Sequence, residues 1–121
     1  MASILIAEDS SVIQNLIKKV LNQSSDDHTF TTVKNGSGLL EKVNSNTYDL
    51  LLVDINIPKV SGIECVKEIR QNVSRKIPIL AITGNAQNLS AEEYRKLGFN
   101  DLVEKPLNFD VLVKKVNEHL Q

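Results

Sequence analysis

Charged and hydroxyl side chains follow strand-like runs at four places in the chain, where they could do chemistry together. They are Glu8 with Asp9, then Asp54, Thr83 and Lys105. Each run has the length of a short strand, so each of these side chains is expected where a strand ends. In an open parallel sheet the carboxyl ends of the strands share one edge, and ligands bind there. The sequence therefore predicts a cleft that holds three carboxylates, a hydroxyl group and an ammonium group.

This set of groups suits phosphoryl transfer. Three neighbouring carboxylates repel one another and need a cation, and oxygen ligands that leave room for water suit Mg²⁺. Phosphoryl transfer depends on positioning and on neutralising charge, and Mg²⁺ also bridges phosphate oxygens. The Asp54 carboxylate could attack phosphorus and form an acyl phosphate, while Lys105 and Thr83 meet the charge on the transferred oxygens. The pattern thus predicts a magnesium-dependent phosphoryl acceptor with Asp54 as the nucleophile.

The stretch that leads to Asp54 is the clearest strand of the sequence. Asp49–Gly62 reads DLLLVDINIPKVSG, with an unbroken apolar run at 50–53 and turn-forming residues at Pro58 and Gly62. A short apolar run that ends in this way is typical of a strand buried on both faces. Asp54 is therefore expected at the rim of the sheet.

Strand-like segments alternate with helical periodicity along the whole chain. The expected strands are Ser3–Ala7, His28–Val33, Leu50–Val53, Ile77–Ile82 and Asp101–Glu104. The first helical stripe consists of Val12, Ile13, Leu16, Ile17, Val20 and Leu21, and the last of Phe109, Leu112, Val113 and Val116. Ser10 can cap the first helix, and Ser90 with Glu93 has the spacing of a capping box before a helix that should end at Gly98. This alternation predicts an α/β fold, a single doubly wound parallel sheet with helices on both faces and right-handed crossovers.

Length and composition exclude several classes of protein. The 121 residues suit one domain, residues 1–121, and the net charge of −1 gives no electrostatic argument for binding nucleic acid or an anionic membrane. The single Cys65 precludes an internal disulfide. No apolar run approaches the about 20 residues of a membrane span, and the start lacks the features of a signal peptide. A soluble, cytoplasmic protein is expected.

The residues singled out above also carry a resemblance to a known family. The acidic pair in LIAEDS, Asp54 in LLLVDINIPKVSG, the turn in AITGNA and the EKP near the end follow one another as they do in receiver domains of two-component response regulators. Each motif alone is weak, but the ordered set is specific and covers essentially the whole chain. The resemblance implies a flavodoxin-like fold with five strands ordered 2-1-3-4-5 and five helices.

The resemblance also implies a function. Asp54 would accept a phosphoryl group from a phosphohistidine on a sensor histidine kinase or a histidine phosphotransfer protein, and would lose it by hydrolysis or onward transfer. The chain would catalyse its own phosphorylation and dephosphorylation while acting mainly as a signalling switch. A downstream effector, or a second copy in a homodimer, would bind the face of the fourth helix and fifth strand.

Family roles carry over to the metal ligands residue by residue. The resemblance implies that Asp9 binds Mg²⁺ directly, as Asp54 does, and that Glu8 binds it directly or through water. The backbone carbonyl of Asn56 would complete the protein's share of the ligands.

The groups around the phosphoryl have family roles too. Lys105 would pair with the Asp54 carboxylate and then with the phosphoryl group. Thr83 would move to hydrogen-bond to that group, and Gly84 would leave room beside it. The bond between Lys105 and Pro106 is expected to be cis.

One residue departs from the family pattern. Receiver domains usually carry Tyr or Phe three residues before the lysine, and its rotation is coupled to the movement of the threonine, but this chain has Leu102 there. Phosphorylation chemistry is therefore expected to be intact and its output altered; Phe99 has the wrong offset to substitute. Asn56 and Asn85 lie two residues beyond Asp54 and Thr83, where they would tune the lifetime of the phosphoryl group.

Each residue also has a purely structural interpretation. Glu8 and Asp9 could be charges favoured by a helix N-terminus, Asp54 a turn former, Lys105 a surface lysine and Thr83 a β-branched strand residue. The ordered set favours the chemical interpretation. Cys65 is expected in the core or at its boundary. Two histidines and four helix lysines are expected to be solvated: His28, His119, Lys18, Lys19, Lys114 and Lys115.

Other functions stay open beside the phosphorylation switch. Leu102 leaves room for a constitutive interaction module with the receiver fold and a weakened switch. An FMN site would need a phosphate-cradling loop after the first strand, but EDSS is acidic there. Since no output domain follows the last helix, the chain is expected to be a stand-alone receiver or one domain of a longer protein such as a hybrid kinase.

Overall fold

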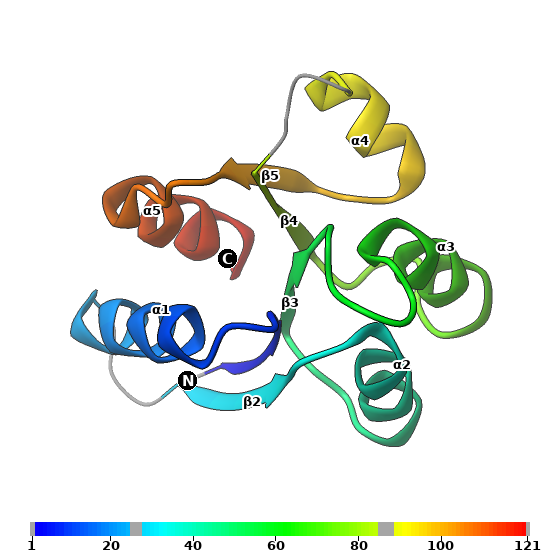
Figure 1. Ribbon diagram of the computed structural model, residues 1–121, viewed down its shortest axis with the longest axis horizontal. Helices are drawn as coiled ribbons and strands as arrows, with labels where there is room; N and C mark the ends of the chain where they lie inside the picture. Colours follow the sequence, from blue (N-terminus) through cyan, green and yellow to red (C-terminus); the bar gives the residue numbers. More distant parts are fainter. Residues whose placement is uncertain (1, 25–27, 85–88, 121) are drawn as a thin grey trace.

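Strands and helices alternate along the chain in the computed structural model, which describes residues 2–24, 28–84 and 89–120 (Figure 1). The strands are β1 (Ser3–Ala7), β2 (Thr29–Val33), β3 (Leu50–Asp54), β4 (Ile79–Thr83) and β5 (Asp101–Glu104). The helices are α1 (Ser11–Ser24), α2 (Gly36–Ser45), α3 (Gly62–Asn72), α4 (Ala91–Leu97) and α5 (Phe109–Leu120). The predicted order of elements is confirmed.

The five strands form one parallel sheet in the order β2-β1-β3-β4-β5, as expected. All residues of β3 are buried, and the strand extends to Asp54, one residue beyond the prediction. The predicted start of β4 at Ile77 is wrong by two residues. Pro78 has no amide hydrogen to donate, and the pairing of β4 with β3 begins at Ile79, which lies opposite Leu51.

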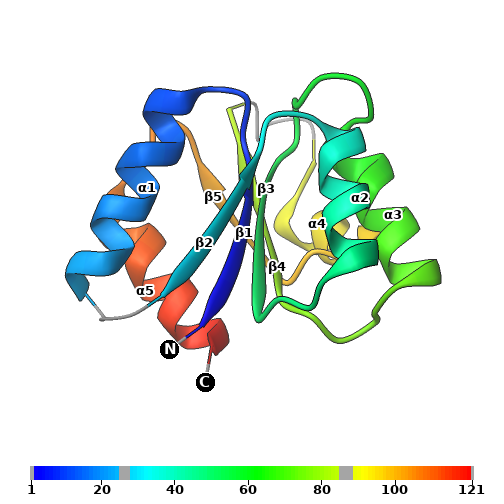
Figure 2. The same ribbon diagram turned by 90° about the horizontal axis from the view of Figure 1, so that it is seen from below.

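Helices cover both faces of the sheet. α1 and α5 lie on one face, and α2, α3 and α4 lie on the other (Figures 1 and 2). Apolar helix residues form a separate core with each face of the sheet. The core under α1 and α5 includes Ile17, Leu21, Leu112 and Val116. The second face includes Leu39, Val66, Ile69, Tyr94 and Phe99. Alternate strand residues thus pack into two cores, one on each face of the sheet.

The stripe predicted for α1 is only partly correct. Ile17 and Leu21 are fully buried, but Val12 is 67% exposed and Leu16 is 39% exposed. The buried face of the helix instead includes Gln14, which lies three residues before Ile17. The Gln14 side chain is 5% exposed. A polar side chain can occupy this position because its amide group finds acceptors there, as described below.

Gly36, the first residue of α2, lies against the backbone of the loop after β3. A Cβ at this position would be 1.9 Å from Val60 O, and the Gly36 N–H donates to Pro58 O at 3.1 Å. Because the obstacle is backbone, we expect Gly36→Ala to lower the free energy of unfolding by about 3 kcal/mol or more, measured by urea denaturation. Gly38→Ala is the matched control, since its Cβ would approach no atom closer than 3.3 Å. Equal losses in the two variants would contradict this account.

The capping box predicted for α4 is confirmed. Ser90 Oγ accepts from Glu93 N–H at 3.1 Å, and Ser90 N–H donates to Glu93 Oε1 at 2.9 Å. The helix ends at Gly98, whose φ of 120° lies in the region that favours glycine. Arg70 of α3 fixes this end, because its Nε donates to Gly98 O at 2.9 Å.

Two groups expected to be solvated at the C-terminal helix are not. Lys115 Nζ lies 3.1 Å from Asp101 Oδ1 and donates to Leu102 O at 2.6 Å. His119 Nε2 lies 3.1 Å from Asp101 Oδ2. Burial raises the pKa of Asp101, but hydrogen bonds from the Leu102 amide, His119 and Lys115 lower it by more. These contacts tie α5 to the start of β5.

The remaining sequence predictions on single residues give mixed results. His28 is half-buried rather than solvated, and its ring nitrogens make no hydrogen bond within the described residues. Cys65 is fully buried, as expected. Burial and the nearby Glu64 charge raise the pKa of the Cys65 thiol to about 11, so it stays protonated at neutral pH.

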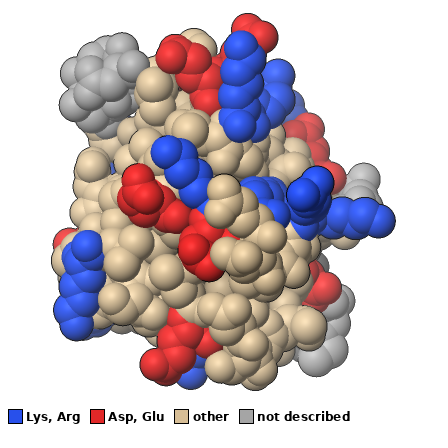
Figure 3. Space-filling model, turned by 90° about the vertical axis from the view of Figure 1, so that its right-hand side faces the viewer, with Lys and Arg blue, Asp and Glu red and all other residues tan. Residues whose placement is uncertain are grey.

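Charges of both signs are interspersed on the face of the molecule seen in Figure 3. Among the described residues, none of the helices combines the length and apolar character needed to cross a membrane.

Candidate functional site

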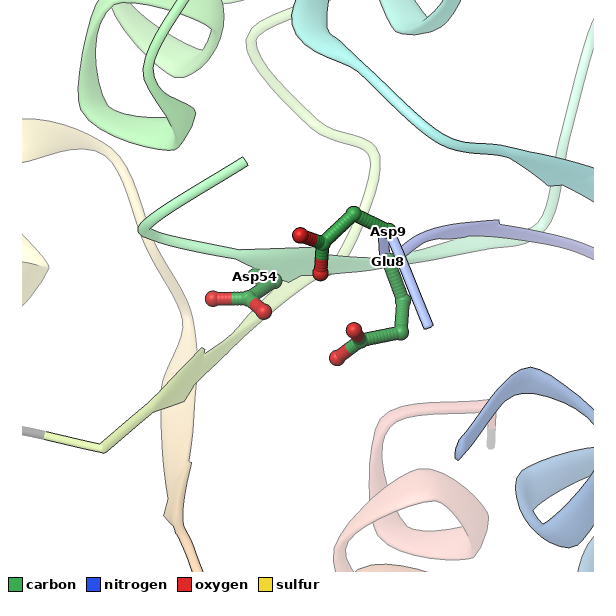
Figure 4. A group of neighbouring side chains, drawn as sticks. All are labelled: Glu8, Asp9 and Asp54. Carbon is green, nitrogen blue, oxygen red and sulfur yellow. The ribbon is translucent and has the colours of Figure 1, made fainter. Parts of the chain in front are cut away.

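Three carboxylates come together at the carboxyl edge of the sheet. Glu8 and Asp9 follow β1, and Asp54 is the last residue of β3, the neighbour of β1 in the sheet. Glu8 and Asp54 are 1% and 2% exposed, whereas Asp9 is exposed. Each offers an oxygen within 4.8 Å of the others, and the three side chains surround a common space (Figure 4). The predicted convergence of the acidic residues is therefore found.

The loop after β1 is held by hydrogen bonds to the end of β2. Glu8 N–H donates to Val33 O at 3.0 Å. Gln14 Nε2 on α1 donates to Glu8 O at 2.7 Å and to Val33 O at 3.2 Å. Ser10 N–H donates to Glu8 Oε2 at 2.9 Å, and Ser10 Oγ caps α1, as predicted, by accepting from Ile13 N–H at 3.3 Å. The Glu8 carboxylate is thus positioned by the start of α1.

Both oxygens of Asp54 accept a hydrogen bond. Oδ1 accepts from the Asn56 backbone N–H at 2.9 Å, and Oδ2 accepts from Lys105 Nζ at 2.8 Å. The backbone beyond Asp54 is fixed because Ile55 N–H donates to Ile82 O of β4 at 3.0 Å. A carboxylate held in this way presents a defined direction of attack to an incoming group.

Lys105 supplies the positive charge of the site. Its Nζ lies 2.8 Å from Asp54 Oδ2 and 3.2 Å from Glu8 Oε1, and its backbone N–H donates to Thr83 O at 2.8 Å. Burial lowers the pKa of Lys105, but its hydrogen bond to Asp54 and the charges of Asp54 and Glu8 raise it by more. The ammonium group is therefore charged at neutral pH. The bond to Pro106 is cis, as expected.

The donor set fits a hard cation. Burial first, and then the adjacent Asp9 and Asp54 carboxyl groups, raise the pKa of Glu8 to about 7, against the lowering effect of the Ser10 amide. Glu8 Oε1 is buried and accepts no hydrogen bond within the described chain, because its contact with Lys105 is an ion pair without hydrogen-bond geometry. A buried oxygen in this state, beside two more carboxylates, matches the oxygen ligands of Mg²⁺.

The other predicted site residues have different surroundings. Thr83 ends β4 with 2% exposure, and its Oγ1 is 3.5 Å from the Tyr94 hydroxyl of α4. Gly84 is exposed, and a Cβ there would lie 3.8 Å from the Lys105 side chain. Leu102 of β5 is half-buried and packs against the core under α4. Asn85 lies outside the described residues.

Sequence reasoning missed two residues that contact this site. Gln14 lies at helical spacing from Ile17 and Leu21, so the periodicity of α1 could have placed it on the buried face. Tyr94 is the lone aromatic residue in the polar helix AEEYRKL, a pattern that could have marked it as the residue that anchors α4. Neither pattern says which atoms the side chain meets.

Comparisons with known proteins agree with this geometry. Residues 4–117 match the family model described as "Response regulator receiver domain". Hybrid signal transduction histidine kinase I of Dictyostelium discoideum is 34% identical over 125 residues, which cover 97% of this chain and 7% of that protein. Sensor protein EvgS of Escherichia coli O157:H7 is 39% identical over 110 residues, 91% of this chain and 9% of that protein.

A solved structure of a receiver domain is also similar to this chain. The receiver domain of sensor histidine kinase PA1611 from Pseudomonas aeruginosa, described with a magnesium ion in its active site cleft, has a TM-score of 0.86 and 28% identity. The match covers 98% of this chain and 97% of that one. The chain spans less than a tenth of the length of the two curated relatives above. By the family model, its relatives and its fold, the chain belongs to the receiver domains of two-component signalling systems.

Proposed function

We propose that this receiver domain accepts a phosphoryl group on Asp54, in a magnesium-dependent reaction, from a phosphohistidine of a sensor histidine kinase or a histidine phosphotransfer protein. The observation that carries the proposal is the buried Asp54 carboxylate, held by Lys105 at 2.8 Å beside Glu8 and Asp9. Two buried acids that share a single ammonium group are costly to a fold, and such clusters are typical of functional sites. The roles given to Asn56, Thr83, Gly84 and Asn85 belong to the same proposal.

The chemistry follows from the positions of these groups. An Asp54 oxygen forms a bond to phosphorus as the bond from phosphorus to the histidine nitrogen breaks, and the imidazole keeps the electron pair. Mg²⁺ held by Glu8, Asp9 and Asp54 would supply charge neutralisation for the phosphoryl oxygens. The Lys105 ammonium group shifts from the Asp54 carboxylate to one phosphoryl oxygen, and the Thr83 hydroxyl donates a hydrogen bond to a second phosphoryl oxygen. Water, or the acceptor of onward transfer, later attacks phosphorus as the bond from phosphorus to Asp54 breaks; hydrolysis releases inorganic phosphate, and either route regenerates the carboxylate.

The phosphoryl group would change the balance of charge at the sheet edge. It adds about −1.5 to −2 charges and three acceptor oxygens. The response would reach the face formed by α4 and β5, where an effector or a second copy binds in the cytoplasm. The competing function, a constitutive interaction module, is favoured only by Leu102 at the position of the family's aromatic residue.

Acetyl phosphate separates the two functions without knowledge of the kinase. The protein is incubated with acetyl phosphate and Mg²⁺, and the adduct is located by intact mass and peptide mapping. We expect a labile adduct on Asp54 that does not form when EDTA is present from the start of the incubation. No adduct with Mg²⁺ present would favour the constitutive module, and an adduct that forms equally well in EDTA would contradict the metal site. Transfer from a panel of the host's kinases then identifies the donor.

A further inference from the structure

Tyr94 lies between the phosphoryl site and helix α4. It is 3% exposed, and its hydroxyl lies 3.5 Å from Thr83 Oγ1, a contact between two buried side chains. Its ring meets the Phe99 ring edge-on, with the centroids 5.8 Å apart and the planes at 85°. One end of the side chain thus touches the end of β4, and the other belongs to the helix.

The space under α4 is filled by this ring. The cavity lined by Tyr94, Phe99 and Leu102 holds only about 10 Å³, which is room for one water molecule at most. Leu102 packs on the outside of the same core and carries no polar atom. The aromatic hydroxyl group that meets Thr83 therefore comes from α4, and β5 contributes an aliphatic side chain.

We infer that Tyr94 transmits phosphorylation of Asp54 from Thr83 to helix α4. The inference rests on the proposed function, because it needs Thr83 to move its hydroxyl to a phosphoryl oxygen. At 3.5 Å the present contact is long for a hydrogen bond between hydroxyl groups, so the contact itself is weak. Once Thr83 has moved, a buried Tyr94 hydroxyl would lose this partner, and burial without a partner is unfavourable. The ring then shifts, and the helix that carries it shifts too.

The two ends of α4 respond differently to such a shift. Arg70 Nε donates to Gly98 O at 2.9 Å, and Arg70 Nη2 donates to Asn100 Oδ1 at 2.8 Å, so the C-terminal end is tied to α3. At the N-terminal end, the capping-box hydrogen bonds join only Ser90 and Glu93, so they do not tie this end to another element. Movement of Tyr94 is therefore expected to alter the exposed first turn of α4, which carries Glu92 and Glu93, more than the last turn, which Arg70 anchors.

The two tyrosines of the chain provide the test, because Tyr48 lines a different pocket between α2 and α3. The protein is labelled with ring-¹³C tyrosine, and beryllofluoride with Mg²⁺ is added to mimic the phosphoryl group. We expect the Tyr94 resonances to shift while those of Tyr48 stay in place, with Tyr48→Phe giving the assignment. The ¹⁹F signal of bound beryllofluoride independently shows that the adduct has formed.

Tyr94→Phe keeps the ring and its contact with Phe99 but removes the hydroxyl group. We expect it to form the adduct normally and to reduce the beryllofluoride-induced change in hydrogen exchange of Ala91–Leu97 by about two- to thirtyfold, the range for mutations that modulate coupling between sites. In a Thr83→Ala background the same change should have no further effect, which a merely structural role of Tyr94 would not predict. Tyr48→Phe is the control.

The outcomes are separable. An adduct with unchanged Tyr94 resonances, or an undiminished response of α4 in Tyr94→Phe, overturns the inference and leaves the phosphoryl acceptor intact. Failure of wild-type protein to bind beryllofluoride overturns the proposed function, and the inference with it.

Discussion

Asp54→Asn is expected to abolish covalent uptake of a phosphoryl group from acetyl phosphate and from any kinase. An amide is not a nucleophile, whereas the Asp54 carboxylate is the group that forms the bond to phosphorus in the proposed reaction. The fold should persist, because the asparagine oxygen can still accept from the Asn56 N–H, and Lys105, which loses its acceptor on residue 54, keeps Glu8 as an ion-pair partner at 3.2 Å. Intact mass after incubation with acetyl phosphate and Mg²⁺ measures the effect, and urea denaturation shows that the variant is folded.

The matched control is Asp110→Asn, which removes an exposed carboxylate from the first turn of α5. It should take up the phosphoryl group at the wild-type rate. An adduct that survives in Asp54→Asn and maps to Glu8 or Asp9 would move the nucleophile to another carboxylate of the same cluster. An adduct elsewhere on the chain would contradict the assignment of this cluster as the phosphoryl acceptor site.

Lys105→Met is expected to slow phosphoryl uptake by about 10²- to 10³-fold, the usual cost of losing one preorganised group that meets charge in a transition state. The Lys105 ammonium group lies 2.8 Å from Asp54 Oδ2 and 3.2 Å from Glu8 Oε1. It is therefore placed to neutralise the negative charge of the carboxylate and then that of the phosphoryl group. Methionine keeps much of the length of the side chain and removes the charge. The rate of adduct formation at saturating Mg²⁺ is the measurement.

Two comparisons separate this role from general effects of charge. Lys114→Met removes an exposed lysine of α5 and should leave the rate unchanged. Lys105→Arg keeps the charge on a larger, planar group and should recover only part of the rate. Wild-type rates in Lys105→Met would show that Lys105 balances the acidic cluster without taking part in the transfer.

The sequence was sufficient for the sheet and for most of the site. Short apolar runs indicate the strands, and apolar stripes of helical period indicate the helices between them. Because the crossovers between parallel strands are right-handed, such a sequence allows few topologies. Parallel strands then bring their ends to one edge whatever the packing details. For this reason the sequence alone groups Glu8, Asp9, Asp54 and Lys105, and the family motifs point to the same residues.

Residues that act through packing could not be placed in this way. Gln14 looks like an ordinary polar helix residue until the ends of β1 and β2 supply the two carbonyl oxygens that its amide group binds. Val12 and Leu16 satisfy the apolar stripe of α1, but no element of the described structure covers them, and they remain partly or largely exposed. Similarly, Lys115 and His119 gain a partner only because α5 docks beside Asp101.

What the sequence determined by itself is the alternation of strands and helices and the chemistry of the groups at the strand ends, since both follow from local pattern and from the rules of parallel sheets. The order of the strands came from the family resemblance, and the sheet confirms it. Only the tertiary structure decided that the aromatic hydroxyl beside Thr83 comes from Tyr94 of α4, while Leu102 occupies the position of the family's aromatic residue in β5. The physical reason is that a buried volume can be filled from either of two packed elements. The spacing of residues along one chain does not reveal which element fills it.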